Sequence, residues 1–518
     1  MSIGALYRLG IVLSAVFLTG VAPVSAAAEW NFARPRVAPE PVSLEYQSNV
    51  CCRLDGKALV RVTCNDAQAA QWIGKRIRED LHVEPRIVSQ QAAHLPAGGG
   101  YELNVSPSGF NLLAEDLQGI RNAYYSLRMV LLAERDVLCS QAWICPELRI
   151  KDAPKFSFRA MHICWFQETP THMIERQLRL CAQLKFNYAI IETWGSFDSE
   201  SVPWYKWKNA VAKREEIKRL VALAKELGVT AIPQLNIFGH ASGARACNGK
   251  HVALDTDYRY APLFEPDGWT WCLSNPNTMK ILLALVGELH ELFGNPPYFH
   301  IGCDEAHPPS CPKCRLLDWP AAVGKHIATV ADFLGKRSAR CLMWHDMLLS
   351  RKDERFVNLK EYPINGASRS SCEKILSAIP KNIIVCDWYY GGKRNTFPTW
   401  EYFKAQGRDL VPSSWMKSDG TISMGENAVK SQVFGFMGTS WHRAYGEALP
   451  HIYLPAAYSA WGCAESYNRH RPGFVEIWRR CGWDMKLTDE DSSGYAPDDL
   501  PSRPFSRPQV PGSWEPWN

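Results

Sequence analysis

The chain has 518 residues, of which 46% are hydrophobic and 21% are charged. These proportions are typical of a globular protein with a large core, and the length favours several domains or one large barrel with an appendage. The net charge of +5 is small for this size and no basic block is present, so no nucleic-acid partner is expected.

The first residues have the pattern of a secretory signal peptide, which we predict over 1–26. Arg8 gives the positive start, an apolar core covers 11–22, and Val24-Ser25-Ala26 has the small residues of a cleavage site. The apolar core is short for a bilayer, and no later run of about 20 apolar residues replaces it. We therefore expect a secreted or periplasmic protein without a membrane span.

A small α/β (α+β) domain is predicted next, over 27–152. The expected strands cover 59–64 and 101–105, and helical spacing of apolar residues covers 66–81 and 117–132. Asp66 is the expected cap of the first helix.

Strand-like and helical runs then alternate regularly over 153–482. The expected strands are 158–163, 187–192, 229–235, 298–302, 340–344, 383–388, 409–412 and 435–441. The expected helices are 172–184, 213–227, 277–293, 321–336, 371–379, 399–406, 424–431 and 454–464. Eight such units favour an α/β fold, a (β/α)8 TIM barrel. An open doubly wound sheet is the alternative, but no Gly-rich phosphate loop follows the first strand. The Pro-rich stretch 483–518 is expected to be an extended tail.

The 17 cysteines are an odd number, so at least one thiol is unpaired unless a bond is intermolecular. Cys139 with Cys145 and Cys247 with Cys272 are candidate disulfides, which export would permit. The cysteines in strand-like apolar runs are expected to be small buried thiols; they are Cys303, Cys341 and Cys386.

Cys311-Pro-Lys-Cys314, with His307 nearby, has the spacing of zinc ligands. A closed structural zinc site needs four ligands, and only three are present in this stretch. A disulfide or free thiols in a loop are therefore favoured here, and no metal site is predicted.

Two adjacent acids, Asp304 and Glu305, end the fourth barrel strand. Acids in this position commonly cap a following helix, but Pro308 and Pro309 disfavour a helix directly after them. Neighbouring like charges raise the pKa of at least one carboxyl, which suits a proton donor near neutral pH.

Polar and aromatic residues follow the other strands, at the rim where such barrels build their active sites. A single Trp is more often packing than ligand, but clustering at one rim indicates a carbohydrate site. The candidates are Arg159 in the first strand and Glu192, Asn236, His240, Trp344, His345, Asp346, Asp387, Trp388, Tyr389, Trp415 and Trp441 at or after strand ends.

Several motifs resemble those of the family 20 glycoside hydrolases, the β-N-acetylhexosaminidases. Phe299-His-Ile-Gly-Cys-Asp-Glu305 resembles H-x-G-G-D-E, with Cys303 in place of the second Gly. Ile232-Pro-Gln-Leu-Asn-Ile-Phe-Gly-His-Ala241 resembles I-P-E-I-D-x-P-G-H-A. Asp152-Ala-Pro-Lys-Phe-Ser-Phe-Arg159 resembles D-x-P-x-F-x-x-R, and 119–132 resembles the helix that closes the family's N-terminal domain. The resemblance covers about 55–465.

The resemblance implies retaining hydrolysis in which the 2-acetamido group of an amino-sugar glycan supplies the nucleophile. Glu305 would then be the general acid and base, and Asp304 would orient the acetamide and stabilise its charge. Arg159 would bind sugar hydroxyls, His240 and His300 would support the acids, and the walls would be Trp344, Trp388 and Trp441. No cofactor is needed by this mechanism.

The chain also departs from the family pattern. The strand-eight W-x-E is replaced by Trp441-His442-Arg443, the strand-seven Tyr-x-Asp is not clear in 413–419, and Asn236 stands where Asp is expected. These departures resemble the divergent hexosaminidase D-like branch. They leave two alternatives: a glycan-binding barrel without activity, or a glycosidase for sugars without the acetamido group. The latter needs a second carboxylate about 5–5.5 Å from Glu305 as nucleophile, with Glu192 or Asp346 as candidates.

Overall fold

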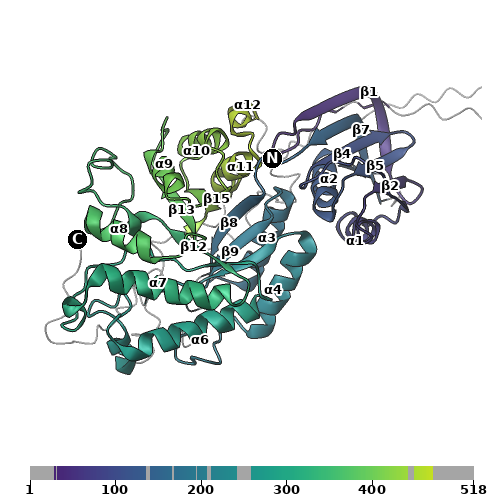
Figure 1. The fold of residues 1–518 in the computed structure, drawn as a ribbon. Coiled ribbons are helices and arrows are strands. Elements are labelled where there is room, and N and C mark those ends of the chain that lie inside the picture. Colours follow the sequence, from purple (N-terminus) through teal and green to yellow (C-terminus); the bar gives the residue numbers. More distant parts are fainter. Residues whose placement is uncertain are drawn as a thin grey trace, which may run out of the picture.

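The computed structural model describes residues 29–470, apart from 31, 136–140, 166–168, 194, 196, 207–211, 242–257 and 442–447. The described chain forms a mixed sheet with two helices, followed by a closed barrel of parallel strands (Figure 1). The predicted signal peptide and Pro-rich tail lie outside the described residues. Among those described, no helix combines the length and apolar character needed to cross a membrane.

The N-terminal domain is a seven-stranded sheet in the order β1-β7-β4-β5-β2-β3, with β6 paired to β7. Its strands are β1 (Ser43–Leu54), β2 (Leu59–Thr63), β3 (Arg86–Gln90), β4 (Tyr101–Ser106), β5 (Gly109–Leu113), β6 (Leu132–Arg135) and β7 (Gln141–Asp152). The helices are α1 (Ala69–Leu81) and α2 (Leu117–Val130). The predicted Asp66 cap is wrong, because Gln68 is the N-cap residue of α1.

The second domain is the predicted TIM barrel, closed in the order β10-β11-β12-β13-β14-β15-β8-β9. Its strands are β8 (Phe158–Cys164), β9 (Tyr188–Glu192), β10 (Thr230–Gln234), β11 (Tyr298–His300), β12 (Arg340–Trp344), β13 (Ile384–Tyr389), β14 (Leu410–Ser414) and β15 (Gly435–Thr439). The helices after them are α3 (Thr171–Gln183), α4 (Arg214–Leu227), α6 (Pro276–Leu292), α7 (Trp319–Gly335), α8 (Arg369–Ala378), α9 (Pro398–Ala405), α10 (Ser418–Lys430) and α11 (Ala448–Trp461).

The barrel interior is apolar at one end and polar at the other. At the amino ends of the strands, the ring of Phe158 packs against those of Tyr188, Tyr298 and Phe434. Because inward-facing residues alternate along a strand, the same face of β8 carries Phe158, Ala160 and then His162. Nearer the carboxyl ends lies a fully buried polar layer that consists of His162, Glu192, Gln234 and His300.

Buried hydrogen bonds join the two domains. Lys185, directly after α3, donates from Nζ to Asp152 Oδ2 at 3.1 Å and to Tyr101 Oη at 2.9 Å. Trp461 of α11 donates to the other oxygen of Asp152 at 2.9 Å. Both charged side chains are completely buried, so each depends on the other for compensation of its lost hydration. The end of β7 is thereby fixed to the barrel.

We expect Lys185→Met to destabilise the whole chain by roughly 3–5 kcal/mol, because it leaves the Asp152 carboxylate buried without a counter-charge. Urea denaturation followed by tryptophan fluorescence measures this loss. The double variant Lys185→Met/Asp152→Asn is the control, and it should recover part of the loss because both charges are gone. A double variant less stable than the single one would contradict the assignment.

Candidate active site

The adjacent acids Asp304 and Glu305 lie just beyond β11, at the carboxyl end of the barrel. Three residues in this turn have positive φ angles: 65° at Gly302, 76° at Cys303 and 45° at Glu305. The chain does not enter a helix after the acids, and the next helical turn is Cys314–Leu316. The alternative in which these acids cap a helix is therefore wrong.

Both peptide groups of Glu305 are held by side chains from neighbouring loops. Its N–H donates to Asp346 Oδ2 at 2.9 Å, and its carbonyl accepts from Trp269 Nε1 at 2.6 Å. Positive φ is unfavourable for a residue with a Cβ atom, so these bonds stabilise a conformation that the chain would otherwise avoid. They fix the direction in which the Glu305 side chain leaves the backbone.

Close backbone packing brings the loop after β10 against the acids. A Cβ atom on Gly239 would lie 1.9 Å from the carbonyl oxygen of Asp304, and one on Gly302 would lie 2.0 Å from Asn236 Oδ1. Only glycine permits these two approaches. They place His240 beside both carboxylates.

His240 bridges the two acids, which have different surroundings. Its Nε2 lies 3.0 Å from Asp304 Oδ2 and 3.2 Å from Glu305 Oε2. The Asp304 side chain is 8% exposed and that of Glu305 is 46% exposed. The second oxygen of Asp304, Oδ1, is buried without a hydrogen-bond partner in the described structure. One acid can therefore accept a bond from a bound molecule, while the other can exchange protons with solvent.

Asp346 is a completely buried carboxylate behind Glu305. Its Oδ1 accepts from Trp388 Nε1 at 3.1 Å, and its Oδ2 accepts from Asn365 Nδ2 at 2.9 Å as well as from Glu305. Burial, with the charge of Asp304 next in size, raises the pKa of Asp346 to about 6. Asp346, the carboxyl whose pKa is raised, thus supports the backbone of Glu305.

Aromatic side chains from three strand ends pack around Tyr390 at this rim. Trp388 and Trp415 pack against Tyr390 with ring centroids 4.9 and 5.4 Å apart, and Trp441 Nε1 donates to Tyr390 Oη at 2.7 Å. Burial, and then the charges of Asp304 and Glu305, raise the pKa of Tyr390 well above its usual value. Tyr390 was not among the predicted site residues, although it directly follows a strand end rich in aromatic residues.

Three other predicted residues lie beneath the acids. Trp344 is fully buried, with its ring centroid 4.4 Å from that of His300 and 5.7 Å from that of Trp441. Burial lowers the pKa of His300 well below its usual value, so this imidazole is neutral. Glu192 accepts from Asn236 Nδ2 at 2.7 Å and lies 3.0 Å from His162 Nε2. These residues form the floor of the site.

The structure does not bring Arg159 to this rim, which corrects the prediction that it binds sugar. It is the second residue of β8, and its neighbours Phe158 and Ala160 face the barrel interior. The guanidinium donates to the carbonyls of Lys185 and Phe156 and lies over the Trp461 ring. Arg159 therefore faces outward, at the junction with the N-terminal domain.

The stretch whose spacing resembles that of zinc ligands does not gather His307 with its two cysteines. His307 pairs with Asp267 at 2.6 Å and stacks on Trp269, away from Cys311 and Cys314. All described cysteines are free thiols, and Cys303, Cys341 and Cys386 are buried as expected. The two candidate disulfides involve Cys139 and Cys247, which lie outside the described residues.

Comparison with known proteins shows which family the barrel resembles. The model of the glycosyl hydrolase family 20 catalytic domain matches residues 172–449. The chain is 25% identical over 329 residues to a beta-hexosaminidase of Vibrio furnissii, covering 55% of this chain and 52% of that protein. It is 23% identical over 289 residues to a beta-hexosaminidase of Akkermansia muciniphila, covering 51% and 57%. The chain spans about half the length of these curated relatives.

Solved structures share the fold. The exo-beta-N-acetylglucosaminidase of Vibrio harveyi in complex with N-acetylglucosamine has a TM-score of 0.63 at 15% identity, covering 88% of this chain and 79% of that one. The N-acetyl-beta-hexosaminidase of Streptomyces plicatus has a TM-score of 0.63 at 16% identity, covering 88% and 96%. These matches include the N-terminal domain as well as the barrel.

The raised pKa of Asp346 predicts a pH-dependent contribution to stability. The folded pKa is about 6 and the usual value is 3.8, so between these values the folded state binds the proton more tightly. Protonation of Asp346 therefore adds to the free energy of unfolding below about pH 4, and this added stability is lost as the pH rises through about 6. It amounts to at most about 3 kcal/mol.

Asp346→Asn removes this titration, so the difference in unfolding free energy between wild type and variant should change between pH 4 and pH 7. Urea denaturation at both pH values measures it. Asp332→Asn, on the outer helix α7, is the control. An identical difference at both pH values would contradict the assignment.

Proposed function

Because the chain belongs to glycoside hydrolase family 20, we propose that it is a retaining β-N-acetylhexosaminidase that removes terminal N-acetylglucosamine or N-acetylgalactosamine. The observation that carries this proposal is the pair Asp304 and Glu305, bridged by His240 at the rim of the barrel. A catalyst of this kind needs one carboxylate beside the sugar and one that moves a proton. The different exposures of the two acids fit this division.

In the first step, the acetamido oxygen of the substrate attacks the anomeric carbon while the glycosidic C–O bond breaks. Glu305 gives its proton to the leaving oxygen, and an oxazolinium ion forms. In the second step, water attacks the anomeric carbon and gives a proton back to Glu305, while the bond from that carbon to the acetamido oxygen breaks and the acetamido group is regenerated. Asp304 accepts the acetamido N–H through its unpartnered Oδ1 and stabilises the positive charge of the ring.

We further propose that Tyr390 supplies a contact to the acetamide. Its raised pKa keeps the hydroxyl protonated, as a donor needs to be. The hydroxyl accepts from Trp441 Nε1 and is also hydrogen-bonded to Thr439, so donation to the acetamide requires its proton to turn from Thr439 toward the bound substrate. This residue could replace the tyrosine that the sequence lacks after β14.

The surroundings of two other acids argue against a glycosidase that uses an enzymatic nucleophile. Glu192 and Asp346 are 2% and 0% exposed, and both oxygens of each accept hydrogen bonds or contact an imidazole. A nucleophilic carboxylate must reach the anomeric carbon. The acetamido group of the substrate is therefore the favoured nucleophile.

A glycan-binding barrel without turnover remains the second candidate, motivated by the missing acid after Trp441. The exposed, protonatable Glu305 argues against it, because binding alone needs no proton donor. Calorimetry with N-acetylglucosamine oligomers, together with an assay for released sugar, distinguishes the two functions. Export to the periplasm or medium is also proposed, on the signal-like pattern of residues 1–26.

Glu305→Gln should lower the hydrolysis rate of N-acetylglucosaminides by about 10²–10⁴-fold. The loss should be larger for a chitobiose substrate than for an activated nitrophenyl glycoside, because a good leaving group needs less protonation. Glu401→Gln, an exposed acid on α9, is the matched control and should keep the wild-type rate. Equal losses of rate on both substrates would show that Glu305 is not the proton donor.

Tyr390→Phe should lower kcat/KM on the same substrates roughly 10²-fold, since it removes a hydrogen bond that orients the acetamido group for attack on the anomeric carbon. Tyr389→Phe is the matched control, because this neighbour stacks on Tyr362 on the opposite side of β13. Unchanged kcat/KM in Tyr390→Phe, with melting temperatures equal for both variants, would show that the tyrosine has no part in the chemistry.

A further inference from the structure

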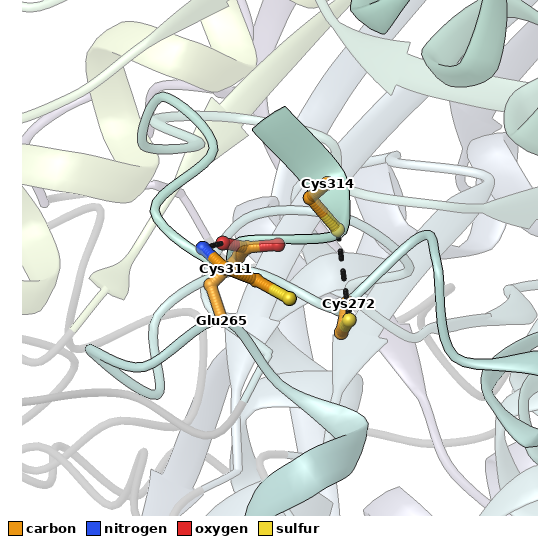
Figure 2. Close-up of side chains that lie close together, drawn as sticks. All are labelled: Glu265, Cys272, Cys311 and Cys314. Carbon is orange, nitrogen blue, oxygen red and sulfur yellow. Dashed lines mark hydrogen bonds between the residues drawn. The ribbon is translucent and has the colours of Figure 1, made fainter. Parts of the chain in front are cut away.

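Four metal-ligand side chains converge outside the proposed catalytic site. Glu265 and Cys272 lie in the loop between β10 and α6, while Cys311 and Cys314 lie in the loop between β11 and α7. One ligand atom of each lies within 4.8 Å of the other three. Figure 2 shows the four side chains meeting between the two loops. The sequence motif Cys311-Pro-Lys-Cys314 thus acquires two further ligands from about forty residues upstream.

The sulfur positions fit a metal better than a disulfide. Cys272 Sγ and Cys314 Sγ are 3.6 Å apart. Zn–S bonds of about 2.3 Å in a tetrahedron place neighbouring sulfurs about 3.8 Å apart, whereas a disulfide requires about 2.05 Å. The cluster therefore already has nearly the dimensions of a tetrahedral thiolate site.

Glu265 provides independent evidence for a missing cation. The side chain is 1% exposed, and its Oε2 accepts from the backbone N–H groups of Ser310 and Cys311, each at 2.7 Å. The other oxygen, Oε1, is buried and has no hydrogen-bond partner within the described chain. A buried carboxylate oxygen without a partner is unfavourable, and a bound cation would satisfy it.

Ser274 supplies a hydrogen-bonding group next to the sulfurs. Its Oγ lies 3.3 Å from Cys272 Sγ, 3.8 Å from Cys311 Sγ and 3.2 Å from Cys314 Sγ. Hydroxyl donors around metal-bound thiolates commonly orient the ligands and balance their charge. The cluster thus has both a complete set of ligands and a group that can support them.

We propose that Glu265, Cys272, Cys311 and Cys314 bind one structural zinc ion. Three soft thiolates and one carboxylate are a ligand set that zinc accepts, and four protein ligands complete the tetrahedron. The ion cross-links the two loops that bear on Glu305, since Trp269 from the first loop donates to its carbonyl. Its role is to fix these loops, and it takes no part in the proposed hydrolysis.

The test is elemental analysis of the full chain purified without chelators. We expect about one zinc per chain in the wild type and in the control Cys372→Ala, a buried thiol on α8. Cys272→Ser and Cys314→Ser should retain less than a tenth of this zinc. Replacement of zinc by Co(II) should give the visible absorption of a tetrahedral thiolate complex in the wild type, and Ser274→Ala should weaken zinc binding roughly 10-fold.

The wild type alone also decides the question if the serine variants fail to fold. Thiol titration of the native protein should show Cys272, Cys311 and Cys314 reacting faster after a chelator is added. The chelator should also lower the melting temperature of the wild type. A zinc-free wild type, or a Cys272–Cys314 disulfide found by peptide mass spectrometry under non-reducing conditions, would overturn the proposal. Zinc content is measured without substrate, so this outcome is independent of the proposed glycosidase activity.

Discussion

Two hydrogen bonds to the peptide groups of Glu305 hold the conformation on which the rest of the site depends. The residue has φ at 45°, a backbone conformation that costs roughly 1–2 kcal/mol for a residue with a side chain. Asp346 and Trp269, from loops after two different strands, offset this cost. The acid is therefore positioned by its backbone, and its side chain stays exposed enough to exchange protons.

The closed barrel gives the two acids unlike surroundings although they are neighbours in sequence. Both contact His240, but the Asp304 side chain is 8% exposed and the Glu305 side chain is 46% exposed. Glycines 239 and 302 allow the loop after β10 to approach within contact distance. Local backbone geometry thus brings both carboxylates to His240, because the same two residues on a regular strand would face opposite sides.

The sequence predicted all eight barrel strands to within a few residues, because buried parallel strands appear as short apolar runs separated by amphipathic helices. It missed five of the N-terminal strands, including β1 and β7, whose mixed composition carries no clear period. Arg159 was expected to bind sugar from a motif resemblance, but its guanidinium donates to the carbonyls of Lys185 and Phe156 on the outer face of β8. Tyr390 directly follows an aromatic-rich strand end and was overlooked, whereas the approach of Cys272 to Cys314 depends on loop paths, which no local pattern specifies.

The buried contact between Lys185 and Asp152 bears on how such a protein can change during evolution. An N-terminal sheet attached only by a linker could be lost or exchanged like a separate module. Here its last strand provides the counter-charge for Lys185, which lies between α3 and β9, so deletion of the sheet would leave this buried cation without compensation. A fragment of the barrel that lacks Asp152 would therefore carry the desolvation cost of Lys185 without its partner.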